Sequence, residues 1–166
     1  MKIIYLTVVL VLATCFTAKA QKGYKNVLRE TNMAFYKTEQ AKQVGNQILA
    51  YQRVTGGWPK NIDMVKPMSH EEIEKVLGEK NRQDDSTTDN DATNMQLLYL
   101  ARLYQATKTQ KYKEAFCKGV EYLLNGQYAN GGWPQFWPKM RDYQIHITFN
   151  DNAMVNTMKL LRDVYQ

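Results

Sequence analysis

Two short clusters of acidic and amide side chains contain the residue types best suited to chemistry in this sequence. The first spans residues 89–93 (Asp-Asn-Asp-Ala-Thr) and the second residues 150–154 (Asn-Asp-Asn-Ala-Met). Each cluster comes just before an apolar helical pattern. Carboxylate and amide oxygens accept hydrogen bonds from the free N–H groups of a helix start, and they are also the ligands that Ca²⁺ prefers. The clusters therefore predict either helix caps or a cation site formed by Asp89, Asn90 and Asp151.

A repeated Gly-Gly-Trp-Pro sequence precedes each cluster, at residues 56–59 and 131–134. Glycine allows a positive φ and proline cannot continue a helix, so both stretches predict loops that end helices. Each tryptophan either packs over a helix end or offers a stacking surface to a sugar ring. Trp133 lies in an aromatic-rich loop, and we take it as a candidate substrate-binding residue. Loops of this kind at helix ends suggest a carbohydrate-binding site.

Three further polar residues are candidates for substrate binding. His146 has no Cys, His or acidic partner at the spacing of a zinc site, so it is either a structural histidine or a ligand contact. Arg141 follows the aromatic-rich loop and is either a surface charge or a partner for a carboxylated sugar. Asn90 belongs to the first acidic cluster. We retain these residues with Trp133 as the predicted substrate-binding set.

The spacing of apolar residues predicts an all-α fold. We expect a helix over residues 31–52, a short helix from Ser69 to Gly78, and further long helices that begin after residues 89, 110 and 150. Ser69 and Glu72 have the spacing of a capping box. The helix, Gly-Gly-Trp-Pro loop, polar segment and acidic cluster occur twice in the same order. Such repeated hairpins predict a ring or solenoid with equivalent loops on one rim.

The first twenty residues have the pattern of a secretory signal peptide, with Lys2, an apolar run and an Ala-Lys-Ala cleavage sequence. The apolar run is too short for a membrane span. We therefore predict a mature domain at residues 21–166 that is secreted or periplasmic. The alternative is lipid attachment at Cys15, although Thr14 fits a lipoprotein sequence poorly.

The composition of the remaining chain excludes some classes of protein. Loss of Lys2 and Lys19 with the signal peptide lowers the formal net charge from +6 to +4. This mild positive charge suits an acidic polymer, but no run of Lys or Arg indicates a nucleic-acid partner. Cys117 is left as a single cysteine, so the domain has no internal disulfide and must rely on its core.

Four stretches together resemble the polysaccharide lyase family 10 pectate lyases. They contain Tyr-Gln and Gly-Gly-Trp-Pro-Lys-Asn in residues 51–61, Thr-Thr-Asp-Asn-Asp-Ala-Thr in 87–93, Asn-Gly-Gly-Trp-Pro-Gln in 122–135 and His-Ile-Thr-Phe-Asn-Asp-Asn-Ala-Met in 146–154. The resemblance covers nearly all of residues 31–166. It implies an (α/α) toroid that cleaves polygalacturonate, the backbone of pectin, by β-elimination.

The resemblance also implies roles for individual residues. Asp89 and Asp151 correspond to carboxylates around an active-site Ca²⁺, with Asn90 beside them. Bound Ca²⁺ stabilises the charge that develops when the proton α to the uronate carboxylate is removed. The expected base is an arginine well downstream of the second cluster, beyond residue 166, and Arg162 lies too close to Asp151 to match it.

We therefore expect an incomplete toroid, truncated before its catalytic base, with an exposed apolar edge that favours self-association. One alternative is a secreted carbohydrate-binding remnant without turnover. Another comes from residues 52–58, whose Gln-x₃-Gly-x-Trp pattern also resembles the repeat of the terpene cyclases, which use α/α toroids too. A secretory signal argues against a cyclase.

Overall fold

The computed structural model describes residues 23–165. The predicted signal peptide and Cys15 lie outside the described residues. Residues 23–28 are helical. The elements that follow are η1 (Phe35–Lys37), α2 (Glu39–Tyr51), α3 (His70–Gly78), η2 (Asp89–Asp91), α4 (Asn94–Thr107), α5 (Gln110–Asn125), η3 (Asp142–Ile145), η4 (Asn150–Asn152) and α6 (Ala153–Tyr165). Within this part of the chain the β-structure is limited to two isolated bridges, so the predicted all-α fold is confirmed.

Capping side chains mark the starts of α2 and α3. The capping box at Ser69 and Glu72 is present, with the Ser69 N–H bonded to the Glu72 carboxylate at 2.7 Å and the Glu72 N–H bonded to the Ser69 hydroxyl at 3.2 Å. The predicted start of the first long helix at residue 31 is wrong. Helix α2 begins at Glu39, because Thr38 has an extended backbone (ψ 156°) and its hydroxyl accepts a hydrogen bond from the Ala41 N–H.

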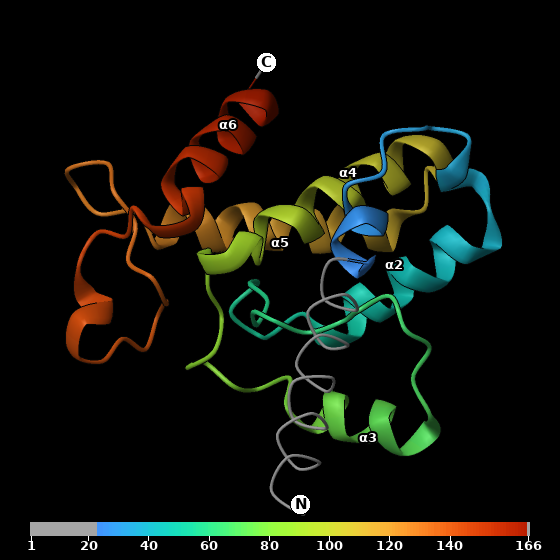
Figure 1. Ribbon diagram of the computed structural model, residues 1–166, viewed down its shortest axis with the longest axis horizontal. Coiled ribbons are helices and arrows are strands. Elements are labelled where there is room, and N and C mark those ends of the chain that lie inside the picture. Colours follow the sequence, from blue (N-terminus) through green and yellow to red (C-terminus); the bar gives the residue numbers. More distant parts are fainter. Residues whose placement is uncertain (1–22, 166) are drawn as a thin grey trace, which may run out of the picture.

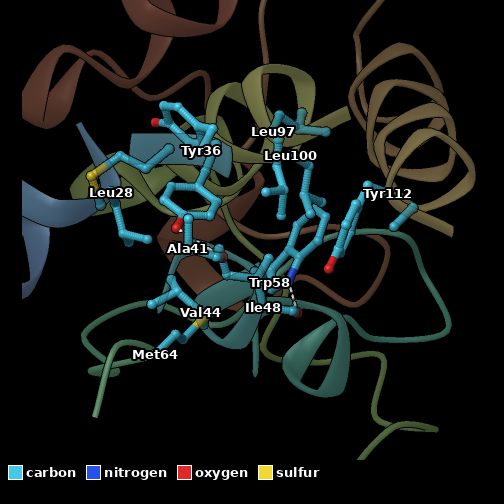
Figure 2. Close-up of a cluster of buried hydrophobic side chains, with 14 of the residues drawn as sticks. Leu28, Tyr36, Ala41, Val44, Ile48, Trp58, Met64, Leu97, Leu100 and Tyr112 are labelled. Atoms are coloured by element: carbon cyan, nitrogen blue, oxygen red, sulfur yellow. Dashed lines mark hydrogen bonds between the residues drawn. The ribbon is translucent and has the colours of Figure 1, made fainter. Parts of the chain in front are cut away.

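Helices α2, α4 and α5 enclose the core, which Figure 2 shows around the fully buried Trp58 and Tyr36. The rings of Tyr36 and Tyr99 meet edge to face with their centroids 5.0 Å apart. Close packing of α4 against α5 depends on Gly119. A Cβ atom there would lie 2.5 Å from Leu97 Cδ2 and 2.9 Å from Trp58 Cζ3, so only glycine fits without a shift of its neighbours.

The internal repeat is visible in the hydrogen bonds of the two Gly-Gly-Trp-Pro loops. The indole N–H of Trp58 donates to the Ile48 carbonyl at 2.8 Å, and that of Trp133 donates to the Leu123 carbonyl at 2.7 Å. The first glycine of each loop has a positive φ, 94° in the first loop and 89° in the second. Each tryptophan thus ties its loop to the helix before it, and both loops leave their helices in the same way.

Helix α6 lies at one side of the molecule, where Figure 1 shows its far end pointing away from α2 and α5. It contacts α4 through its buried residues, which include Thr157 and Leu160. Its other face exposes Val155, Met158 and Val164. No helix in residues 23–165 is both long and apolar enough to cross a membrane.

Candidate functional site

The two acidic clusters fold into matching turns, η2 and η4. Asn90 has φ 53° and ψ 35°, and Asp151 has φ 47° and ψ 33°. The next residue in each cluster, Asp91 and Asn152, also has a positive φ. Asn and Asp tolerate this left-handed conformation better than other non-glycine residues. The two turns contact each other, so the repeat brings its polar clusters together at the starts of α4 and α6.

Asp89 is the centre of this cluster. It is 2% exposed, and both of its carboxylate oxygens are fully engaged. Oδ2 accepts hydrogen bonds from Lys60 Nζ and, at 2.7 Å, from Gln135 Nε2. Oδ1 accepts from the Asn90 N–H at 3.0 Å and from Asn150 Nδ2 at 3.4 Å. Asp89 therefore joins its own turn to three segments that are distant in the sequence, those of Lys60, Gln135 and Asn150.

The surroundings of Asp89 keep it ionised. Burial by itself would raise the pKa of this carboxyl group. The hydrogen bonds from Lys60 and Gln135, the positive charge of Lys60 and the Asn90 N–H outweigh burial, and the pKa falls below its usual value. Lys60 also lies over the Phe136 ring, 5.4 Å from its centroid, which further fixes the position of the ammonium group.

Asn150 connects the two predicted metal ligands. Its Nδ2 donates to Asp89 Oδ1 at 3.4 Å and to Asp151 Oδ2 at 2.9 Å, so both carboxylates lie within hydrogen-bonding distance of one amide group. Asp151 is exposed. Sequence reasoning placed Asn150 in the second cluster but assigned it no role. The internal repeat aligns Asn150 with Asp89, and that alignment is the signal that could have found it.

The chemistry of this donor set fits a hard cation such as Ca²⁺. The carboxylates of Asp89 and Asp151 converge, and a half-turn of the Asn150 amide would present its carbonyl oxygen to the same space. No three His, Cys, Asp or Glu side chains gather as a metal centre in the described part of the chain, so a cation here would draw on amide oxygens as well. The Lys60 ammonium supplies the positive charge beside Asp89 in this structure.

The other acidic and amide members of the first cluster, Asp91 and Asn90, make different contacts. The Asn90 amide donates to Asn61 Oδ1 at 3.0 Å, and it is the Asn90 backbone that meets Asp89. Asp91 forms ion pairs with Lys25 at 3.2 Å and Arg29 at 2.7 Å. These pairs fasten the helix before η1 to η2, so Asp91 holds the cluster in place. Asn90 contributes mainly through its backbone.

A groove of about 380 Å³ opens beside Asn150. Its polar lining includes the exposed side chain of His146. The aromatic rings in the groove are those of Tyr143 and Phe149, which are 69% and 78% exposed. Gln135 lines the groove as well, and its buried Oε1 has no hydrogen-bond partner. The groove therefore combines flat apolar rings with polar groups, as sugar-binding sites do.

Trp133 and Arg141 do not line this groove. Trp133 is only 3% exposed and its indole N–H is bonded to Leu123, so a sugar ring cannot stack on it in this arrangement and its role is structural. Arg141 is exposed next to η3, and its charge helps to hold the pKa of Asp84 below the usual value, after the larger effect of a hydrogen bond from Arg82.

The sequence matches a known protein family, and the fold is similar to that of solved structures. The pectic acid lyase family matches residues 52–166. The family 10 polysaccharide lyase from Cellvibrio cellulosa has a similar structure, with a TM-score of 0.64 and 32% sequence identity over 78% of this chain. A mutant of that enzyme, solved in complex with trigalacturonic acid, matches equally well. The chain spans 38% of the length of each.

No curated protein matches the chain. The family match covers more than half of the sequence and contains both Gly-Gly-Trp-Pro loops and both acidic clusters. The overall fold of the described residues is similar to that of a family 10 polysaccharide lyase. The chain belongs to the pectic acid lyase family.

Proposed function

We propose that this protein binds polygalacturonate through a Ca²⁺ ion held between Asp89 and Asp151, and that it acts in β-elimination cleavage of that polymer. The observation that carries the proposal is the position of Asn150, which touches both carboxylates and also lines the groove. The exposed aromatic rings and polar groups of the groove lining suit pyranose rings. The trigalacturonic acid bound to the Cellvibrio relative supports the choice of substrate.

The residues of this chain would prepare the substrate for proton loss. Elimination removes the proton on C5 of a uronate and breaks the bond between C4 and the glycosidic oxygen, which leaves a C4–C5 double bond. Bound Ca²⁺ would supply a positive charge to the uronate carboxylate. Asp89 is held ionised and in one orientation by Lys60 and Gln135, and a cation beside it would take over the position of the Lys60 ammonium group and of the Asn150 amide N–H.

The rest of the groove would position the sugar. His146 and the exposed Asn150 place polar groups at the groove walls, where they can meet ring hydroxyls. Tyr143 and Phe149 offer apolar faces to the C–H face of a pyranose. We assign no base to this chain. The arginine implied by the family resemblance was expected beyond residue 166, so turnover by this chain is a separate question from binding.

The test is a calorimetric titration of residues 21–166 with trigalacturonic acid in Ca²⁺ and then in excess chelator. We expect saturable binding only with Ca²⁺, and we expect Asp151→Ala to abolish it with little change in helix content, because Asp151 is exposed. Asp163→Ala is the matched control, since this exposed acid on α6 lies outside the cluster. Equal binding in chelator would refute the calcium site, and loss of helix in Asp151→Ala would favour a capping role.

An elimination assay separates the enzyme from the binding protein. The unsaturated uronate product absorbs in the ultraviolet, so product can be followed directly with polygalacturonate at alkaline pH. Product that disappears with chelator would assign a base within the chain. Calcium-dependent binding without product would identify the alternative, a secreted carbohydrate-binding protein. The predicted signal peptide makes either form an exported protein, which sequencing of the mature N-terminus would check.

A further inference from the structure

A second groove, of about 520 Å³, lies next to the first Gly-Gly-Trp-Pro loop. Its walls come from residues 52–56 and from the C-terminal half of α5, with Lys80 at one side. None of its lining residues lines the aromatic groove or belongs to the Asp89 cluster. It is therefore a separate feature that the proposed function does not use.

One of the residues that line this second groove is a buried arginine, Arg53. The side chain of Arg53 is 1% exposed. One edge of its guanidinium, formed by Nε and Nη2, binds the Asp85 carboxylate at 3.1 Å and 2.8 Å, and Nη2 also meets Glu79 at 3.0 Å. The remaining nitrogen, Nη1, is buried without any hydrogen-bond partner. Since the guanidinium is planar, the N–H groups of Nη1 point away from the edge that Asp85 occupies.

An unsatisfied buried N–H of a charged group is unfavourable, and an acceptor placed beside it would remove that cost. The two bonds to Asp85 fix the Arg53 side chain, so a ligand would meet a preorganised donor. The other cations of the groove are available too. The ammonium groups of Lys80 and Lys118 form no ion pair and no hydrogen bond with the described residues, and Glu121 is the only acid among the lining residues.

We propose that this groove is an oxyanion-binding site in which Arg53 Nη1 donates to one oxygen of a carboxylate, sulfate or phosphate group. Lys80 and Lys118 bind the outer oxygens of the same group. Asp85 and Glu79 hold the opposite edge of the guanidinium and do not face the ligand. Glu121 lines the groove, and its negative charge repels the anion and weakens binding. The ligand chemistry fits either a uronate carboxylate or a free inorganic oxyanion.

The sources are distinguished by three probes. Sodium sulfate, galacturonate and neutral galactose are each titrated against residues 21–166 in excess chelator, which removes any contribution from a Ca²⁺ site. NMR follows the side-chain N–H resonances of Arg53. We expect a saturable shift with sulfate or galacturonate and none with galactose. The charged probe with the lower Kd identifies the source, and the result is independent of polygalacturonate cleavage.

Substitutions at the rim test the location without disturbing the buried arginine. We expect Lys80→Gln and Lys118→Gln each to weaken binding about two- to fivefold, and Glu121→Gln to strengthen it about twofold. Lys113→Gln and Glu114→Gln are matched controls, because both residues are exposed on the same helix but outside the groove. The proposal fails if no charged probe saturates the Arg53 shift, or if the controls change the Kd as much as the rim variants.

Discussion

Replacing Asp89 with asparagine tests whether the acidic cluster holds the fold together. The substitution keeps the shape of the side chain and removes its charge. One oxygen remains, so the donors on the other side meet an NH₂ group in place of an acceptor. On the Oδ2 side those donors are Lys60 and Gln135. Hydrogen bonds to a charged group contribute about 1.5–3 kcal/mol each, and partial exposure of Lys60 allows water to replace it, so we expect a loss of about 2–4 kcal/mol.

The loss should depend on pH. The pKa of Asp89 is lower in the folded protein than in the unfolded chain, so its contribution is complete above the unfolded pKa of about 3.9 and disappears as the pH falls through the folded pKa. Urea unfolding followed by circular dichroism measures the free energy of unfolding at pH 7 and at pH 3. The difference in the free energy of unfolding between wild type and Asp89→Asn should be complete at pH 7 and smaller at pH 3.

The control for this experiment is Asp163→Asn. Asp163 is an exposed acid whose ion pair is with its neighbour Arg162, so its removal should change the free energy of unfolding by less than about 0.5 kcal/mol. A difference below that value for Asp89→Asn would refute the central role given to Asp89. A large loss that is equal at pH 7 and pH 3 would show that shape, and not charge, is responsible.

Three other features can be tested by substitution. Gly119→Ala should lower the free energy of unfolding by about 1–3 kcal/mol through overpacking against Leu97, whereas Gly78→Ala, with open space around it, should not. Trp133→Phe should cost at least about 1 kcal/mol in urea unfolding, because the buried Leu123 carbonyl loses its donor. If the apolar face of α6 promotes self-association, Met158→Lys should shift sedimentation toward monomer, and an unchanged sedimentation coefficient would contradict this.

Local patterns in the sequence were enough to predict the secondary structure and the internal repeat. Hydrophobic periodicity and the Ser69 capping box are properties of neighbouring residues, and both predictions were confirmed. The helix predicted from residue 31 began at Glu39, because an apolar pattern does not show where an extended residue interrupts it. The two Gly-Gly-Trp-Pro loops could also be predicted from the sequence, since the same sequence forms the same turn twice.

The sequence by itself thus determined an all-α fold, two equivalent polar turns and a family. Tertiary structure decided which side chains meet. Trp133 is buried because its indole bonds to the helix before it, while Tyr143 and Phe149 form the exposed aromatic surface. Asp89 is surrounded by Lys60, Gln135 and Asn150, which are distant in sequence. Periodicity reports only on residues within a few turns of each other, so contacts between distant loops become visible only when the helices have packed.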